Sequence, residues 1–202
     1  MTSGHILFHG KPIHEDLSSF KRHMGYVPEE PYLYNHLSAV EYLTMVVQLR
    51  DLPERVWSER IDGLLRMLAL SDDRHASISG YSKGMRQKVL IAAALLHNPE
   101  IVLLDEPFSG LDVGSALMLR SLIQELAARV KVVLFSSHEL DTVERVCSHV
   151  VILHRGRVVA DDSIERLRTL MELPTLEKIF SQLVVEEDTE SMARQIADLI
   201  HA

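Results

Sequence analysis

Short apolar runs alternate with longer amphipathic segments along the chain. Apolar runs at residues 24–27, 101–104 and 130–136 predict strands, and the run at 101–104 has the composition of a strand buried on both faces in a parallel sheet. Between the first two runs, residues 38–50 and 53–68 predict helices, because a Ser-x-x-Glu capping box opens one and apolar residues at helical spacing mark the other. Strands that alternate with helices indicate an α/β fold with a mostly parallel sheet and flanking helices.

The two ends of the chain depart from this alternation. Residues 4–13 predict a strand, a glycine turn and a second extended piece, and residues 149–160 predict a hairpin through Arg155-Gly156. From Ser163 onward the pattern is helical, with one amphipathic face that contains Leu176, Ile179, Phe180 and Leu183. An acidic break at 186–188 precedes a last predicted helix with Met192, Ile196 and Leu199. We therefore expect an inserted helical subdomain and a helical C-terminal tail around the sheet.

Two acids, Asp105 and Glu106, follow the apolar run at 101–104 directly. In open α/β sheets ligands bind at the carboxyl ends of the strands, where an acid can hold Mg²⁺ or orient a water toward a phosphate. His138 follows the strand predicted at 130–136 and is expected at the same edge. Taken alone, the acids could be an ordinary acidic turn, and the histidine a cap or a surface residue.

A Ser/Gly-rich turn at residues 78–84 leads into a helix predicted from Met85 to His97, before Pro99. A helix N-terminus with free N–H groups, a serine hydroxyl and nearby cations is a good phosphate site. Ser82 could equally be an ordinary N-cap. Glu29, beyond the strand at 24–27, could bind a metal or a water, or be a solvated loop acid.

Composition narrows the function classes. The chain has 202 residues, 47% apolar and 25% charged, and its net charge of −8 argues against a nucleic-acid surface, which needs clustered Lys and Arg. The single cysteine, Cys147, excludes an internal disulfide framework and is expected to pack on a helix. The N-terminus has no signal-peptide layout, and the longest apolar run, 89–96, is far below the roughly 18 residues of a membrane span. We expect a soluble, cytoplasmic protein.

No phosphate loop of the form G-x-x-x-x-G-K-[ST] occurs in the sequence. Gly10-Lys11 comes nearest, but Gly4 is one residue too far away, and Pro12 has neither a hydroxyl nor a backbone N–H. We expect Gly10 to be a hairpin glycine.

Five motifs stand in an order that resembles the ATP-binding subunit of an ATP-binding-cassette (ABC) transporter, from about residue 3 to about residue 185. They are Tyr26-Val27-Pro28-Glu29, YSKGMRQ from Tyr81, IVLLDEP from Ile101, SGLD from Ser109 and FSSHE from Phe135. The resemblance, closest to exporter-type systems, implies a P-loop-NTPase-like fold. It divides the chain into the rest of the N-terminal nucleotide-binding core (1–29), a helical subdomain with the signature loop (30–98), the core sheet (99–165) and a helical tail (166–202).

The resemblance also implies roles for single residues. Asp105 would hold Mg²⁺ through water, Glu106 would polarise the attacking water, and His138 would contact the γ-phosphate of ATP. In the signature loop (Tyr81–Met85), Ser82 and Gly84 would touch the γ-phosphate of ATP on the opposite subunit.

The resemblance also implies residues that connect this site to a second ATP site and to the membrane partner. Ser109 and Asp112 would couple the two ATP sites of a dimer. Glu29 would sense the metal and link the site to the membrane partner.

Three departures from the family pattern stand out. Glu29 replaces the usual Gln, and its charge would weaken phosphate contacts unless Mg²⁺ is present. The signature loop has the sequence YSKGM in place of LSGGQ, so that Lys83 adds a cation that could suit phosphate, while Tyr81 and Met85 alter the packing of the loop. The third departure is the missing phosphate loop, which the resemblance places roughly twenty residues ahead of Met1.

Three hypotheses follow. In the first, the chain is an ATP-hydrolysing subunit, incomplete at its N-terminus, that powers a transporter through a membrane-spanning partner and pairs with a second nucleotide-binding subunit at the inner face of the membrane. In the second, it is a regulatory subunit that offers its signature loop to a partner's ATP, which leaves Glu106 and His138 unexplained. In the third, it is a non-transport ABC-type ATPase, which the absence of heptads or a repeat disfavours.

Overall fold

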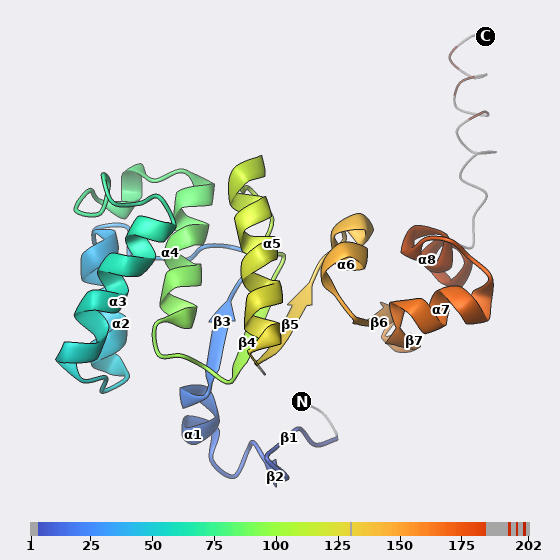
Figure 1. The fold of residues 1–202 in the computed structure, drawn as a ribbon, viewed down its shortest axis with the longest axis horizontal. Helices are drawn as coiled ribbons and strands as arrows, with labels where there is room; N and C mark the ends of the chain where they lie inside the picture. The colour runs from blue at the N-terminus through green and yellow to red at the C-terminus, as the bar shows by residue number, and fades with distance from the viewer. Residues whose placement is uncertain (1–3, 130, 185–193, 195–196, 198–199, 201–202) are drawn as a thin grey trace. The chain divides into compact units, whose positions relative to one another are not determined.

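The computed structural model describes residues 4–129 and 131–184, together with residues 194, 197 and 200 (Figure 1). It divides into two compact units, the first ending at Ser137 and the second beginning at His138. In the described part of the chain, no helix combines the length and the apolar character needed to cross a membrane.

The first unit opens with a small hairpin and a short helix. Strands β1 (Leu7–Phe8) and β2 (Lys11–Pro12) pair antiparallel, and Gly10 takes φ +77° in the turn, as a hairpin glycine does. Helix α1 (Leu17–Arg22) begins after Asp16, whose carboxylate accepts from the N–H of Ser19. The predicted hairpin and the role of Gly10 are confirmed.

Three parallel strands form the sheet of this unit, in the order β3-β4-β5. They are β3 (Met24–Val27), β4 (Ile101–Asp105) and β5 (Val132–Ser136). The register aligns Tyr26 with Leu103 and Leu103 with Leu134, so that all three carboxyl ends meet at one edge. The predicted parallel sheet is confirmed, although β5 begins at Val132, two residues after the predicted start.

Helices α2 (Ala39–Leu49) and α3 (Glu54–Met67) follow β3. The capping box is present: the Ser38 hydroxyl accepts from the Glu41 N–H, and the Glu41 carboxylate accepts from the Ser38 N–H. The apolar core of this helical region also includes the short 3₁₀ turn η1 (Ile78–Gly80) and the middle of helix α4 (Lys83–Leu95). Its fully or almost fully buried side chains include Leu43, Val47, Ile61, Leu65, Leu70 and Ile78.

Helices α4 and α5 (Val113–Ala128) pack on one face of the sheet (Figure 1). Val102 and Leu104 of β4 point to this face and are buried against both helices. Side chains alternate along a strand, and on the opposite face Val132 and Leu134 of β5 are 61% and 62% exposed. For β4 the expected burial on both faces is met on one face only among the described residues, because Ile101 and Leu103 on the other face are partly exposed.

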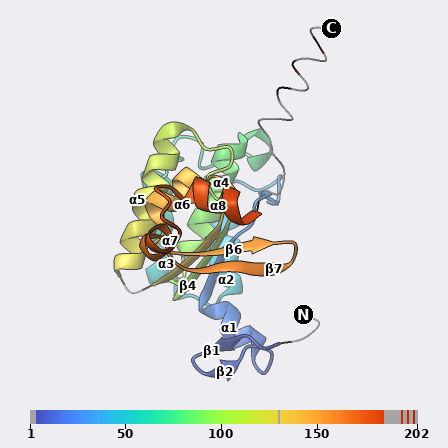
Figure 2. The ribbon, with the colours of Figure 1, turned by 90° about the vertical axis from the view of Figure 1, so that its right-hand side faces the viewer.

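The second unit contains helix α6 (Leu140–Val146), the antiparallel hairpin of β6 (His149–His154) and β7 (Arg157–Ser163), and helices α7 (Ile164–Met171) and α8 (Leu176–Val184) (Figure 2). The predicted hairpin is confirmed, and the Glu144 carboxylate of α6 pairs with Arg168 of α7. Burial raises the pKa of the Cys147 thiol to about 11, which suits a packing residue that stays protonated at neutral pH. The predicted acidic break and last helix, with Met192, Ile196 and Leu199, lie outside the described residues.

Candidate functional site

Asp105 and Glu106 lie at the carboxyl end of β4, as predicted. Asp105 is the last residue of the strand, and its Oδ1 accepts a hydrogen bond of 2.5 Å from the Ser136 hydroxyl at the end of β5. The same Ser136 oxygen accepts from the Glu106 backbone N–H at 3.1 Å. Glu106 itself has φ +43°, a conformation that is costly for a residue with a side chain. Ser136 thus holds both acids at the edge of the sheet.

Sequence reasoning did not select Ser136. The signal that could have found it is its position at the last residue of the strand that neighbours β4. A small hydroxyl residue there is close enough to bond an acid that ends the adjacent parallel strand.

Helix α4, which follows the start of the signature loop, begins two residues earlier than predicted. Ser82 is the N-cap, because its hydroxyl accepts from the Met85 N–H at 3.2 Å, and the helix therefore starts at Lys83 in place of Met85. It ends at Leu95 in place of His97, and Asn98 follows with φ +56°. The N-cap role of Ser82 is confirmed. Its hydroxyl and the first N–H groups of α4 lie together at the N-terminus of the helix.

Tyr81 anchors the signature loop from behind. Its ring is buried in the helical core, and its hydroxyl donates a hydrogen bond of 2.6 Å to the Asp73 carbonyl. Burial raises the pKa of this phenol, so the hydroxyl remains a donor at neutral pH. Tyr81 therefore positions the residues that follow it.

The start of α4 packs against the 106–112 loop (Glu106–Asp112), which connects β4 to α5. The Lys83 ammonium donates to the Ser109 hydroxyl at 3.1 Å. A Cβ on Gly84 would lie 2.9 Å from the Gly110 carbonyl oxygen, so the two backbones approach closely only because this residue is a glycine. The signature loop and the 106–112 loop, to which the resemblance assigns the coupling between two ATP sites, are therefore in direct contact.

Asp112 ends the 106–112 loop and caps α5. Its carboxylate accepts from the Ser115 hydroxyl at 2.6 Å and from the Ser115 N–H at 2.9 Å, and these hydrogen bonds hold its pKa below the usual range. Lys88 of α4 lies 4.0 Å from the same carboxylate. Asp112 is therefore ionised at neutral pH and tied to both α4 and α5.

Glu29 and His138 are the predicted site residues farthest from this junction along the chain. Glu29 is exposed two residues beyond β3, whose carboxyl end lies at the same edge of the sheet as that of β4. His138 is the first residue of the second unit. Its predicted contact with a phosphate bound near Asp105 and Glu106 stays a prediction.

These residues fit Mg²⁺ and a nucleotide in part. Carboxylate oxygens are the ligands that Mg²⁺ prefers, and it is commonly held by one or two of them together with phosphate oxygens and waters. Among the described residues no group of three His, Cys, Asp or Glu side chains is placed so that it could hold a metal ion by itself. The ring of N–H groups and the lysine of a phosphate loop do not occur in residues 1–202.

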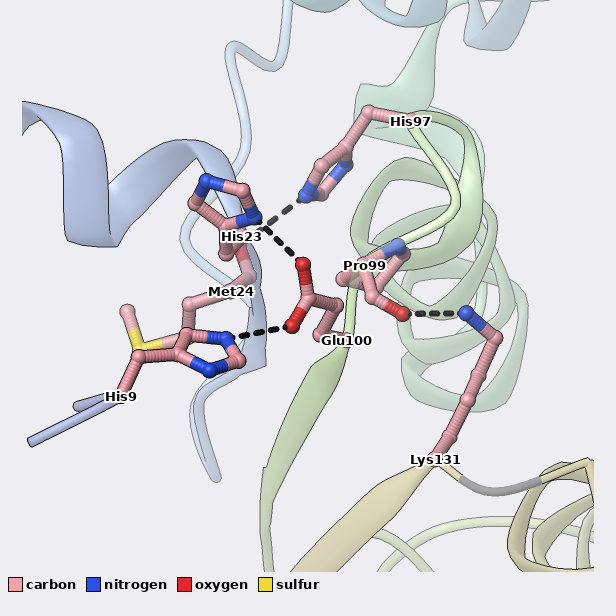
Figure 3. A network of polar contacts seen from close by, with 7 residues as sticks. All are labelled: His9, His23, Met24, His97, Pro99, Glu100 and Lys131. Atoms are coloured by element: carbon pink, nitrogen blue, oxygen red, sulfur yellow. Dashed lines mark hydrogen bonds and ion pairs between the residues drawn. The ribbon is translucent and has the colours of Figure 1, made fainter.

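A second polar network lies at the opposite, amino-terminal edge of the sheet (Figure 3). The Glu100 carboxylate is bonded by His9 Nε2 at 2.9 Å and by His23 Nδ1 at 2.8 Å, and these contacts lower the pKa of Glu100. His97 Nε2 lies 3.1 Å from the Met24 carbonyl, and burial lowers the pKa of His97 to about 4. This network attaches the N-terminal hairpin to the starts of β3 and β4, and no motif in the sequence indicated it.

Comparison with known proteins identifies relatives of one kind. The family model described as ABC transporter matches residues 1–109. The chain is 38% identical to an uncharacterized ABC transporter ATP-binding protein of Nostoc sp., over 82% of this chain and 50% of that protein. It is 37% identical to the ABC transporter ATP-binding protein NatA of Bacillus subtilis (77% and 63%) and 32% identical to the ATP-binding protein EcsA of the same species (91% and 75%). The chain thus spans half of the Nostoc protein and less than two thirds of NatA.

Solved structures agree with this result. An ATP-binding subunit of an ABC transporter superposes with a TM-score of 0.84 at 33% identity, covering 90% of this chain and 77% of the other. CbiO1 from Clostridium perfringens, described as part of the ABC transporter complex cbiONQ, gives a TM-score of 0.68 at 24% identity, covering 85% and 77%. The second likeness concerns the fold alone.

Proposed function

Because the chain belongs to the family of ABC transporter ATP-binding proteins, we propose that it forms the hydrolytic and dimer-facing part of an ATPase subunit that powers transport through a separate membrane-spanning partner. The family binds and hydrolyses ATP. The observation that carries the proposal is the junction at one edge of the sheet, where Ser136 holds Asp105 and Glu106 and the start of α4 packs on the loop that follows them.

Glu106 is the residue we assign to the attacking water. Its carboxylate polarises that water, and the hydrogen bond from its N–H to Ser136 fixes the backbone from which the side chain projects. Asp105, which the Ser136 hydroxyl orients, would hold Mg²⁺ through a water. The metal, when bound, neutralises charge on the phosphates. His138, the first residue of the second unit, is our candidate for contacting the γ-phosphate, as the family pattern implies.

The signature loop serves ATP bound to a second nucleotide-binding subunit. The first N–H groups of α4, Ser82 and Gly84 present fixed dipoles to a phosphate, which need no reorganisation during the reaction. Lys83 adds a positive charge, which the Ser109 hydroxyl holds beside the loop. Ser109 and Asp112 then couple the two ATP sites of the dimer.

Glu29 is our candidate for the link to the membrane partner, a role supported by its exposed position beyond β3. The names of the curated relatives, as ATP-binding proteins of ABC transporters, support such a partner, which would place the subunit at the inner face of the membrane.

The proposal takes the phosphate loop from outside residues 1–202. It is supported by the exposed apolar face of the sheet around Tyr26, Val132 and Leu134, which a further strand and helix could cover. A regulatory subunit that lends only its signature loop is the second candidate. The intact junction between α4 and the 106–112 loop favours it, whereas the ordered pair of Asp105 and Glu106 favours hydrolysis.

Substitution of Glu106 tests the hydrolytic proposal. We expect Glu106→Gln, in the protein purified with its partners from its own cells, to lose about 10²-fold or more of its ATP hydrolysis, because loss of one preorganised catalytic contact has this order of effect. Phosphate release is the measurement.

The matched control is Glu125→Gln, at an exposed position on α5, which should keep the wild-type rate. Hydrolysis that survives Glu106→Gln at the wild-type rate would exclude the assigned role and leave the regulatory candidate.

A further inference from the structure

One buried side chain near the site has no hydrogen bond. Gln87 of α4 is fully buried, and neither its Nε2 nor its Oε1 has a partner among the residues that the structure describes. A buried amide without partners is costly, and such groups are rare in native proteins. The motif comparison gave Gln87 no role.

The helix geometry places Gln87 beneath the 106–112 loop. Helix α4 runs antiparallel to the strands: Gly84 meets Gly110 at the carboxyl-terminal edge, and Ala94 meets Gly25 near the start of β3. Gln87 shares a helix face with Ile91, which lines the apolar interior together with Leu104. Gln87 lies four residues, about 6 Å along the helix axis, closer to the loop than Ile91.

The neighbours of Gln87 on α4 already contact this loop. Lys83 bonds Ser109, Gly84 meets Gly110, and Lys88 lies near Asp112. These contacts fix residues 109–112, at the end of the loop.

The start of the loop has a different character. Glu106 has φ +43°, which is strained for a residue with a side chain. Gln87 shares its helix face with Ile91, which lines the apolar interior with Leu104, and Glu106 lies two residues beyond Leu104. The unpaired amide is therefore on the side of α4 that faces the strand from which the loop starts.

We propose that Gln87 is a positioning residue for Glu106, whose amide hydrogen-bonds peptide groups of residues 106–108 in a second arrangement of the loop. In the arrangement described here the amide is unpaired and Glu106 is strained; in the second arrangement the amide is paired and the carboxylate of Glu106 is re-aimed. The role of Glu106 in this inference rests on the proposed function. The rearrangement of the loop itself requires no nucleotide.

The test is NMR relaxation dispersion of backbone ¹⁵N in the 202-residue chain without nucleotide. We expect exchange on the microsecond-to-millisecond timescale at Glu106 and Phe108, matched in rate by the side-chain amide of Gln87. Gln87→Met keeps the side-chain length and removes the amide. It should abolish this exchange and raise the Tm by about 2–8 °C, because a buried unpaired group is lost.

Gln48→Met, at an exposed position of α2, is the matched control and should change neither measurement. Absence of exchange in the wild-type chain, exchange that persists in Gln87→Met, or a lower Tm for that variant would overturn the inference. A different rate for the Gln87 amide would overturn it without any variant. None of these outcomes bears on the hydrolysis test with Glu106→Gln, so failure of one proposal is distinguishable from failure of the other.

Discussion

Single side chains at the two ends of β4 have different roles. At the carboxyl end, the Ser136 hydroxyl donates to the Asp105 carboxylate and accepts from the Glu106 N–H. These two hydrogen bonds fix the orientation of the Asp105 side chain and of the Glu106 backbone. At the amino end, Glu100 accepts from His9 and His23 and joins the N-terminal hairpin to the sheet. The strand therefore carries its candidate chemistry at one end and its attachment at the other.

The Glu100 contacts predict a pH dependence of stability. The pKa of Glu100 is lowered in the folded protein, so its contribution is present above the ordinary carboxyl value, about 4.3, and is lost as the pH falls through the lowered value. We expect the Tm difference between the wild type and Glu100→Gln to be largest near pH 6 and to shrink progressively as the pH falls toward 3. Thermal melts at pH 6, 5, 4 and 3 measure it.

Glu59→Gln, an exposed position on α3, is the control and should show a pH-independent difference. A wild-type advantage over Glu100→Gln that persists unchanged down to pH 3 would contradict this account.

At the scale of elements, helix starts organise the first unit. Ser38, Ser82 and Asp112 each accept from an N–H in the first turn of their helix, and two of the three lie at the candidate site. The caps at Ser82 and Asp112 set where α4 and α5 begin, which brings Lys83 within reach of Ser109. The geometry of the site thus depends on local capping.

The capping box at Ser38 gives a direct test of this dependence. Ser38→Ala removes the acceptor for the Glu41 N–H in a buried position, and we expect a loss of about 1–2 kcal/mol and a fall in Tm of about 2–8 °C. Thermal melting by circular dichroism measures it. Ser121→Ala, at an exposed position inside α5, should shift the Tm far less, and equal shifts would refute the capping argument.

At the scale of the whole molecule, the proposed function assigns only part of an ATP-hydrolysing site to the described residues. They carry the acids and the signature loop, while the backbone ring and lysine that supply much of the phosphate affinity are missing from residues 1–202. The exposed apolar face of β3 and β5 agrees with a sheet that needs further cover.

Residues 1–202 alone should therefore bind Mg-ATP poorly. We expect calorimetric titration of the purified 202-residue chain to give no micromolar affinity, because one carboxylate and a helix end replace a full phosphate site. An intact relative with a phosphate loop, measured in the same buffer, is the positive control. Micromolar binding by the chain alone would show that these residues hold the phosphates in a way that neither the motifs nor the fold indicates.

The sequence alone determined the order of the elements and the family. Periodicity located β3, β4, α2 and the β6–β7 hairpin closely, since each is specified by local signals such as an apolar run, a capping residue or a glycine turn. The five motifs identified an ABC ATP-binding protein before any contact was known, and Asp105 and Glu106 were placed at the correct edge of the sheet.

Tertiary structure alone decided which residues meet. The bonds of Ser136 to both acids, of Lys83 to Ser109, and of His9 and His23 to Glu100 join residues 26–91 positions apart, and no local pattern encodes such a pair. The exposed face of β5 and the unpaired amide of Gln87 could likewise not be predicted from the sequence. An apolar run or a helical spacing indicates that a side chain can be buried, but not what covers it. The sequence therefore specified the candidate chemistry, and packing decided how that chemistry is held.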